Sequence, residues 1–321
     1  MFALSFAKFT EARCKKSVYI RIMNWSNTLF KSVLNFTCRK CTFILLFCIF
    51  SLFINSLTKT KTKRSLFIYF RYKGCLYTKS DIHISDKQNY NFTLYKVKAS
   101  NFPIRKAQDI FSFNSPYNFR IGYNINDRYA VSIGIDHMKY KTILNQDVHI
   151  NGYIKNKASA TYAANYNDST IRLGWDFFYM EHSDGLNYIS VEGDYTFYKL
   201  KLFKDFLSID FTAGLGFGVM LPRTENYLFQ QGANHPYHLS GFGMDIHLYP
   251  KIYISRFFFL QPSTKFGFID MPDVYVDTHL DTKEKLSQHF FFFQWNLVVG
   301  ANLPLSKQEL KMRKRIKPTD K

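Results

Sequence analysis

Apolar and polar side chains alternate without a break over residues 207–220. The apolar phase consists of Leu207, Ile209, Phe211, Ala213, Leu215, Phe217 and Val219. The small or polar phase consists of Ser208, Asp210, Thr212, Gly214, Gly216 and Gly218. Because only extended chain has a period of two, the pattern predicts a β-strand with one apolar face. The stretch is long enough to cross a bilayer, which takes a tilted strand of ~9 to 11 residues.

The same alternation recurs between residues 91 and 305 and predicts further strands. These strands cover residues 92–97, 117–124, 129–139, 158–166, 171–179, 187–198, 242–248, 260–268 and 291–303. The segment 92–97 has the weakest pattern. With 207–220, the sequence therefore predicts about ten strands, and 8 to 12 is the range that the pattern allows.

The connections between these strands alternate between short and long. Short ones lie at 125–128, 167–169, 199–206 and 253–256, and the others at 99–116, 140–157, 181–187, 221–238 and 269–288. Outer-membrane barrels combine short periplasmic turns, longer outer loops and an even strand count. The sequence therefore predicts an all-β fold, an antiparallel up-and-down transmembrane β-barrel in a bacterial outer membrane, with both termini periplasmic.

A soluble β-sandwich or lipocalin-like barrel is the main alternative, and in it the apolar face would point inward. The polar phase argues against it, because it is rich in Asp and Gly and poor in Lys, as in a narrow lumen where opposite charges pair. We expect a largely plugged lumen and lipid-facing Leu215, Phe217 and Val219. The expected lumen charge network is Arg120, Asp136, Arg172, Asp176, Glu192, Asp194, Asp210, Asp245, His247 and Lys265.

The net charge of +19 does not reflect the predicted barrel. Residues 1–75 carry 14 Lys and Arg against one acid, and residues 306–321 carry seven against two, so the region between them is almost neutral. A folded basic groove for nucleic acid is therefore not expected. The 34 Phe and 22 Tyr suit strands and membrane interfaces.

The chain divides into four segments. Residues 1–57 combine a basic segment with an apolar stretch at 43–57 that has the length of a signal-peptide core, with a membrane anchor as the alternative. Residues 58–90 are expected to be a linker, 91–305 the barrel, and 306–321 a basic periplasmic tail. All five cysteines precede residue 76. Cys38 and Cys41 have metal or redox spacing but lack a second pair, so neither role is expected.

Three segments carry a family resemblance: 117–123 (Tyr-Asn-Phe-Arg-Ile-Gly-Tyr), 135–140 (Ile-Asp-His-Met-Lys-Tyr) and 181–188 (Glu-His-Ser-Asp-Gly-Leu-Asn-Tyr). Together with the aromatic last strand, they resemble uncharacterised outer-membrane β-barrel families of Gram-negative bacteria, particularly the Bacteroidetes type. The resemblance covers about residues 80–305 and implies the architecture. Such families include porins, adhesins, lipid enzymes and structural proteins, so the resemblance does not imply one activity.

Two groups of residues are candidates for chemistry at the outer rim. His137, Lys139 and Lys141 could meet lipopolysaccharide phosphates through charge-assisted hydrogen bonds, with ordinary rim positions as the alternative. Glu181 and His182 carry the carboxylate and imidazole of a hydrolase site. A partner such as His137 or Ser159 would have to come from another loop, because adjacent side chains in extended chain point apart.

A metal at Asp210, Asp245 and His247 is an alternative to ion pairing in the lumen, but we expect neither a metal nor a cofactor. The leading functional hypothesis is an integral outer-membrane barrel with a structural or binding role through its outer loops. A lipid hydrolase or acyltransferase and a small-solute porin are the alternatives. The expected partners are outer-membrane lipid, lipopolysaccharide and the barrel-assembly machinery, with an extracellular ligand that the sequence does not specify.

Overall fold

A computed structural model describes residues 64–86, 88–101, 118–182, 184–202, 207–254, 257–276 and 284–305. All of them belong to one compact unit, Lys59–Lys321. The expected signal, the Cys38 and Cys41 pair and the basic tail lie outside the described residues. Within these ranges, no helix is long and apolar enough to span a membrane.

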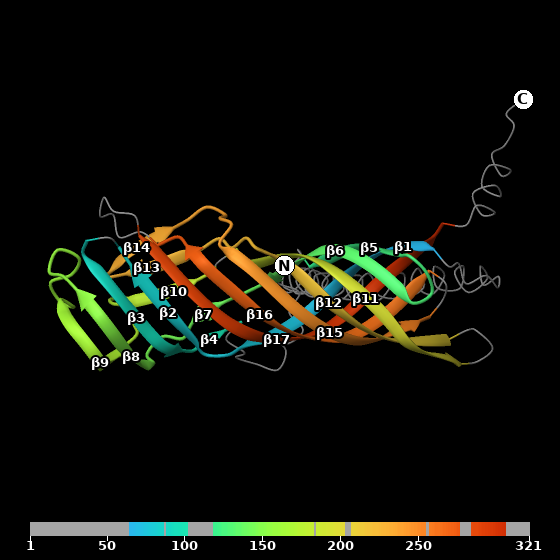
Figure 1. The fold of residues 1–321 in the computed structure, drawn as a ribbon, viewed down its shortest axis with the longest axis horizontal. Helices are drawn as coiled ribbons and strands as arrows, with labels where there is room; N and C mark the ends of the chain where they lie inside the picture. Colours follow the sequence, from blue (N-terminus) through green and yellow to red (C-terminus); the bar gives the residue numbers. More distant parts are fainter. Residues whose placement is uncertain are drawn as a thin grey trace, which may run out of the picture. The chain divides into compact units, whose positions relative to one another are not determined.

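Eight antiparallel strands close into a barrel (Figure 1). In order around the barrel they are β1 (Ser65–Tyr77), β5 (Phe119–Asn124), β6 (Tyr129–Met138), β11 (Leu186–Leu202), β12 (Leu207–Met220), β15 (Gly241–Tyr253), β16 (Phe258–Val274) and β17 (Lys285–Pro304). The first and last of these strands, β1 and β17, pair with each other and complete the closure. The predicted antiparallel all-β barrel is confirmed, and eight strands fall within the predicted range.

The two ends of the barrel differ. Short connections at 125–128, 203–206 and 254–257 join strands at one end, and the long connections lie at the other. Ser65 pairs with both Asn124 and Pro304, so the start of β1 and the end of β17 lie at the short-turn end. Both ends of the barrel domain therefore lie on the same side, as the connection lengths predict.

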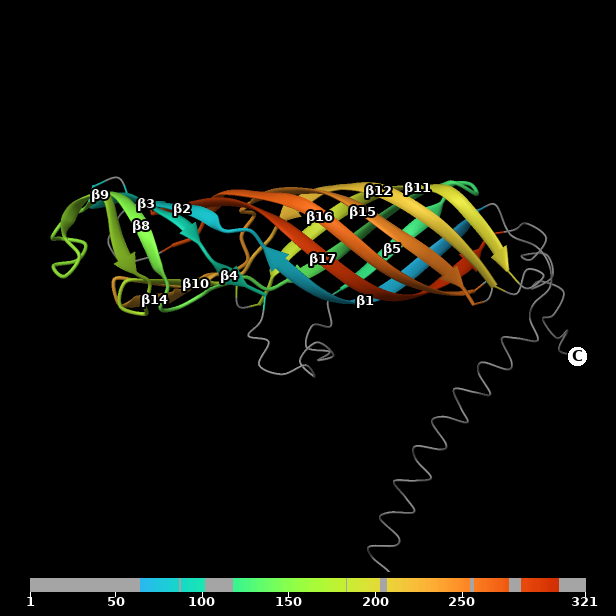
Figure 2. The ribbon, with the colours of Figure 1, turned by 90° about the horizontal axis from the view of Figure 1, so that it is seen from below.

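Two further sheets are built from the long connections (Figure 2). One continues the barrel wall from β17 through β2 (Ser80–Ser85), β3 (Tyr90–Val97), β8 (Asp147–Ile154) and β9 (Ala164–Arg172). The other has the order β14 (Gln231–Asn234), β13 (Glu225–Leu228), β10 (Phe178–Glu181), β7 (Lys141–Thr142) and β4 (Ala99–Ser100). We call these the outer sheets.

Four predicted segments have a different place in the structure. The expected linker 58–90 contains β1 and β2, and the weak strand 92–97 corresponds to β3 in an outer sheet rather than in the barrel. Segments 158–166 and 171–179 contribute to β9 and β10, which also lie outside the barrel. The turn predicted at 167–169 lies inside β9. Alternation identifies a half-buried strand but does not distinguish a barrel strand from a strand of an outer sheet.

The interior of the barrel is filled in three layers. Nearest the short-turn end, Phe67, Tyr69, Phe259 and Val298 form a small apolar cluster. A layer of charged side chains follows. At the other end the large hydrophobic core begins, in which barrel residues such as Met138 and Phe292 pack with Ile82, Phe92 and Phe178 of the outer sheets. The outer sheets therefore cap the barrel with a continuous apolar core.

The outer surface of the barrel is apolar. Leu215, Phe217 and Val219 are 66%, 60% and 39% exposed, whereas Asp210 on the opposite phase is 4% exposed. The predicted orientation of this strand is confirmed. Neighbouring strands present the same surface, with Val131, Val191, Ile246, Phe266 and Val299 exposed.

Candidate functional site

An ionic network crosses the middle layer of the barrel. Lys265 of β16 lies at its centre, with its Nζ 2.6 Å from Glu192 Oε1, 3.0 Å from Asp136 Oδ2 and 3.5 Å from Asp245 Oδ2. Arg120 Nη2 lies 2.6 Å from the same Glu192 oxygen, and Arg71 Nη1 lies 2.8 Å from Asp136 Oδ1. The network therefore links β1, β5, β6, β11, β15 and β16 across the lumen.

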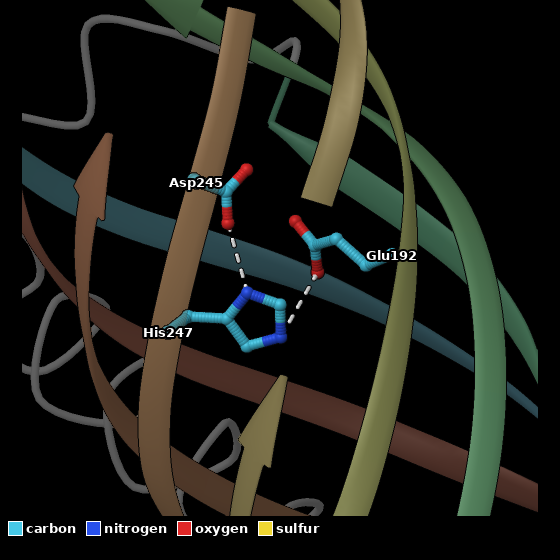
Figure 3. Close-up of side chains that lie close together, drawn as sticks. All are labelled: Glu192, Asp245 and His247. Atoms are coloured by element: carbon cyan, nitrogen blue, oxygen red, sulfur yellow. Dashed lines mark hydrogen bonds and ion pairs between the residues drawn. The ribbon is translucent and has the colours of Figure 1, made fainter. Parts of the chain in front are cut away.

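His247 lies nearer the short-turn end of β15 than Asp245 and extends the network in that direction. Figure 3 shows its ring beside Asp245 and Glu192. Its Nδ1 lies 2.9 Å from Asp245 Oδ1 and its Nε2 2.9 Å from Asp194 Oδ1. Glu192 Oε2 lies 3.9 Å from the same Nε2. Because a carboxylate oxygen only accepts, both ring nitrogens donate and the ring is a cation.

The charges of this network balance. Three cations, Arg71, Arg120 and Lys265, face four carboxylates, and protonated His247 supplies the fourth positive charge. The four carboxylates are Asp136, Glu192, Asp194 and Asp245. Buried charges persist when they are paired and hydrogen-bonded in this way. The arrangement is that of a closed structural plug.

Glycines in β12 provide the space for this network. A Cβ added at Gly214 would clash with Nε2 of His247, and one at Gly216 would clash with Oδ2 of Asp245. Both glycines lie directly opposite those residues in the pairing of β12 with β15. These two glycines therefore make room for lumen charges.

Glu192, Asp245 and His247 are close enough together to hold a metal ion. The residues around them fit a metal poorly, because Lys265 and Arg120 already lie 2.6 Å from Glu192 Oε1 and supply the positive charge. His247 also uses both ring nitrogens on carboxylates. The metal site considered from the sequence also included Asp210. This residue is not part of the group, and its Oδ2 lies 3.5 Å from Lys199 Nζ.

Two predicted network residues are elsewhere. Arg172 is exposed on β9 and forms an ion pair with Asp147, with its Nε 2.9 Å from Oδ1. Asp176 is exposed in the connection between β9 and β10 and accepts a hydrogen bond from the Tyr162 hydroxyl. The prediction was wrong for both, because Arg172 lies on a strand of an outer sheet and Asp176 lies in the connection that follows it.

The residues predicted to face lipopolysaccharide are not arranged for that role. His137 is buried at 7% exposure, and its Nδ1 lies 2.8 Å from Asn187 Oδ1. Lys141 forms an ion pair with Glu181 at 2.6 Å. Lys139 is only partly exposed. His137 therefore cannot meet a phosphate at the surface, and that prediction was wrong.

The candidate catalytic residues are also dispersed. His182 is fully buried, and its Nδ1 lies 3.0 Å from the Thr224 hydroxyl rather than near Glu181 or His137. Burial lowers the pKa of His182 to about 3, so its ring is neutral near pH 7. Glu181 instead accepts hydrogen bonds from Lys141 and the Tyr179 hydroxyl. A buried neutral imidazole is not accessible to a substrate.

Sequence reasoning missed three lumen cations, Arg71, Lys73 and Lys251. Arg71 and Lys73 lie on the inward phase of β1, and the aromatic Phe67 and Tyr69 on the same phase obscure its polar character. Lys251 is buried among rings, with its Nζ 4.0 Å from the ring centre of Phe259 and 4.4 Å from that of Phe67. A cation within an aromatic run is the one signal that marks these residues.

Comparisons with known proteins concern the fold alone. No protein-family model and no curated protein matches the chain. The outer membrane protein OprG from Pseudomonas aeruginosa aligns over 75% of this chain and 97% of its own, at 7% identity and a TM-score of 0.36. The outer membrane protein AlkL aligns over 78% and 94%, at 10% identity and 0.35. Ail of Yersinia pestis aligns over 76% and 100%, at 8% identity and 0.26. Such values carry no information about function, which has to be inferred from the barrel itself.

Proposed function

We propose that this protein is an integral outer-membrane β-barrel that acts as a closed anchor and displays its outer sheets for binding. The single observation that carries the proposal is the filled interior, in which a balanced ionic network lies between two apolar layers. A lumen packed in this way leaves no continuous path for solutes. The function then belongs to the parts outside the barrel wall.

Insertion in a membrane is supported by the distribution of polarity. A soluble barrel buries apolar side chains and exposes charge, whereas here the barrel buries charge and exposes Phe, Leu, Ile and Val. Short turns at the end that holds both ends of the barrel domain are typical of the periplasmic side. Outer-membrane lipid, lipopolysaccharide and the assembly machinery are the partners that such a location implies.

One face of an outer sheet is suited to binding. Tyr179 and Tyr227 are cross-strand partners, and Trp175 lies against both, with ring centres 4.1 Å from Tyr179 and 4.8 Å from Tyr227. Glu181 and Glu225 form the next pair on the same face. Trp175 is 50% exposed. Tyr179 is buried at 7% exposure, and Tyr227 is half-buried. The exposed indole of Trp175 beside these carboxylates is suited to recognition of an extracellular partner.

Two measurements test this function. Membrane fractionation should recover the protein only with detergent, and recovery in the soluble fraction would overturn the anchor. Purified protein in planar bilayers should give no steady conductance, with insertion checked separately by protease protection of the barrel. A steady open channel from inserted protein would instead support the small-solute porin.

A further inference from the structure

A groove of about 830 Å³ lies on the outer wall of the barrel. It is lined mainly by outward residues of β6, β11, β12, β15, β16 and β17 and by the turn before β6, with a few lumen-phase residues between them. The volume falls within the ~300 to 1,000 Å³ of typical small-ligand sites.

The strand register explains why the wall is hollow here. Two neighbouring rows of outward residues cross the strands: Tyr129, Tyr195, Ala213, Leu248 and Thr264 form one, and Val131, Gly193, Leu215, Ile246 and Phe266 form the other. Gly193 and Ala213 are the smallest members and lie on neighbouring strands. Larger side chains surround them. The floor of the groove is therefore formed by the backbone of Gly193 and the methyl group of Ala213, and larger side chains, several of them aromatic, form its sides.

The floor offers an occupant space but few hydrogen-bond partners. Nothing lies within 4 Å of a Cβ added at Gly193. Asp194 and His247 line the groove from behind the glycine backbone, and their polar atoms are directed at each other, with Nε2 2.9 Å from Oδ1. An occupant that needs no hydrogen bonds fits such a floor.

A polar end is present at the short-turn side. Ile125, Asn126 and Tyr129 line the groove where the connection between β5 and β6 turns. Arg128, exposed in that turn, donates a hydrogen bond from Nη1 to the Tyr195 hydroxyl at 3.2 Å. Asp127 in the same turn balances the charge of Arg128. Selectivity for an occupant of the groove therefore comes from the hydrogen-bond donors of the guanidinium group rather than from net charge.

We propose that the groove is a phospholipid site, in which one acyl chain lies over Gly193 and Ala213 and the lipid phosphate accepts hydrogen bonds from Arg128. This inference rests on the membrane insertion proposed above, because the groove is continuous with the lipid-facing surface. The acyl chain matches an apolar floor without donors, and the phosphate matches a guanidinium at the membrane surface. The site holds a lipid in place and has no chemical step.

Native mass spectrometry of the full chain, purified from membranes in mild detergent and titrated with phosphatidylglycerol, tests the site. G193L and A213L fill the floor, and A301L adds the same side chain to the outward face of β17 outside the groove. We expect wild type and A301L to retain one lipid. The filled variants should bind about tenfold more weakly, as loss of about two buried CH₂ groups implies. R128Q should weaken binding while leaving the floor intact.

The outcomes separate this inference from the proposed function. Protein found in the soluble fraction would overturn both. Protein found in the membrane, with equal lipid retention in G193L, A213L and A301L, would overturn only the lipid site. A dimer that dissociates in G193L would show that a second copy of the chain occupies the groove, and would also overturn the site. Equal binding by R128Q would overturn the phosphate contact.

Discussion

Gly214 of β12 lies opposite His247 of β15, and the imidazole fills the space that a Cβ at residue 214 would need. The same relationship joins Gly216 to Asp245 one pair further along. The network therefore depends on the absence of side chains at these positions of the neighbouring strand as much as on its own charges.

Gly214→Ala should destabilise the barrel, because the added methyl group displaces an imidazole held by two carboxylates. Overpacking of this kind costs about 1 to 3 kcal/mol. Gly193→Ala is the matched control on the neighbouring strand, since an added Cβ there meets nothing within 4 Å. Urea unfolding in lipid vesicles, followed by tryptophan fluorescence, compares the two. Equal midpoints would contradict the tight fit at Gly214.

Lys265→Met should be among the most damaging single changes. It leaves Asp136, Glu192 and Asp245 with one cation fewer, and breaking a buried pair in this way costs about 3 to 5 kcal/mol. Glu192→Gln combined with Lys265→Met should cost less than the sum of the two single changes. Arg172→Ala removes the exposed pair with Asp147 and should cost less than about 1 kcal/mol. Equal losses for Lys265→Met and Arg172→Ala would argue against a buried network.

Acid should loosen the outer sheets through His182. Burial lowers the pKa of His182 to about 3 in the folded state. Below the ordinary pKa of histidine, the unfolded segment therefore binds a proton that the folded segment does not bind. Stability from this group is complete above pH 6.5 and is lost as the pH falls toward 3. Between pH 7 and pH 5 the loss is about 2 kcal/mol. Hydrogen exchange of β10 and β13 amides, corrected for intrinsic rates, measures it.

His182→Gln is the control for this pH effect. Glutamine can keep a hydrogen bond to Thr224 and does not titrate, so the difference between pH 5 and pH 7 should become smaller. An unchanged pH dependence in the variant would mean that other groups, such as the carboxylates, cause it.

Leu215→Arg should distinguish lipid from water around the barrel. A charged residue on the lipid face of a barrel costs about 2 to 4 kcal/mol near the bilayer midplane. Ile143 is 41% exposed beside an outer sheet, and Ile143→Arg there should cost little, because that side chain faces water. The measurement is the urea midpoint in vesicles. Similar small effects at both positions would mean that Leu215 does not face lipid.

The sequence predicts the barrel strands best where one phase is charged and the other apolar. In β12 the residues Asp210 and Leu215 define the two faces unambiguously, and the structure confirms them. In β1 both phases begin with large apolar residues, because Phe67 and Tyr69 form the apolar layer of the lumen. The strand, and Arg71 with it, was therefore read as a linker.

The ion pairs themselves could be predicted only as a set. Alternation places Asp136, Glu192 and Lys265 on the inward phase, but which carboxylate meets which cation depends on the register between strands far apart in the chain. The outer sheets are not predicted, because the apolar and polar residues of 171–179 alternate as in a barrel strand, whereas the segment runs from the end of β9 into β10. Arg172 and Asp176 were assigned to the lumen for that reason.

The last strand has a consequence for how the protein forms. β17 pairs with β1 over Phe292–Pro304 and with β2 over Lys285–Gln288, so one strand both closes the barrel and begins an outer sheet. β2, through which β3, β8 and β9 are attached to the barrel, lacks one of its neighbouring strands until β17 has been made. We therefore expect the barrel and the outer sheets to fold cooperatively. The binding surface of the outer sheets then forms only after β17 has paired with β1, so it is not exposed while the chain is being exported.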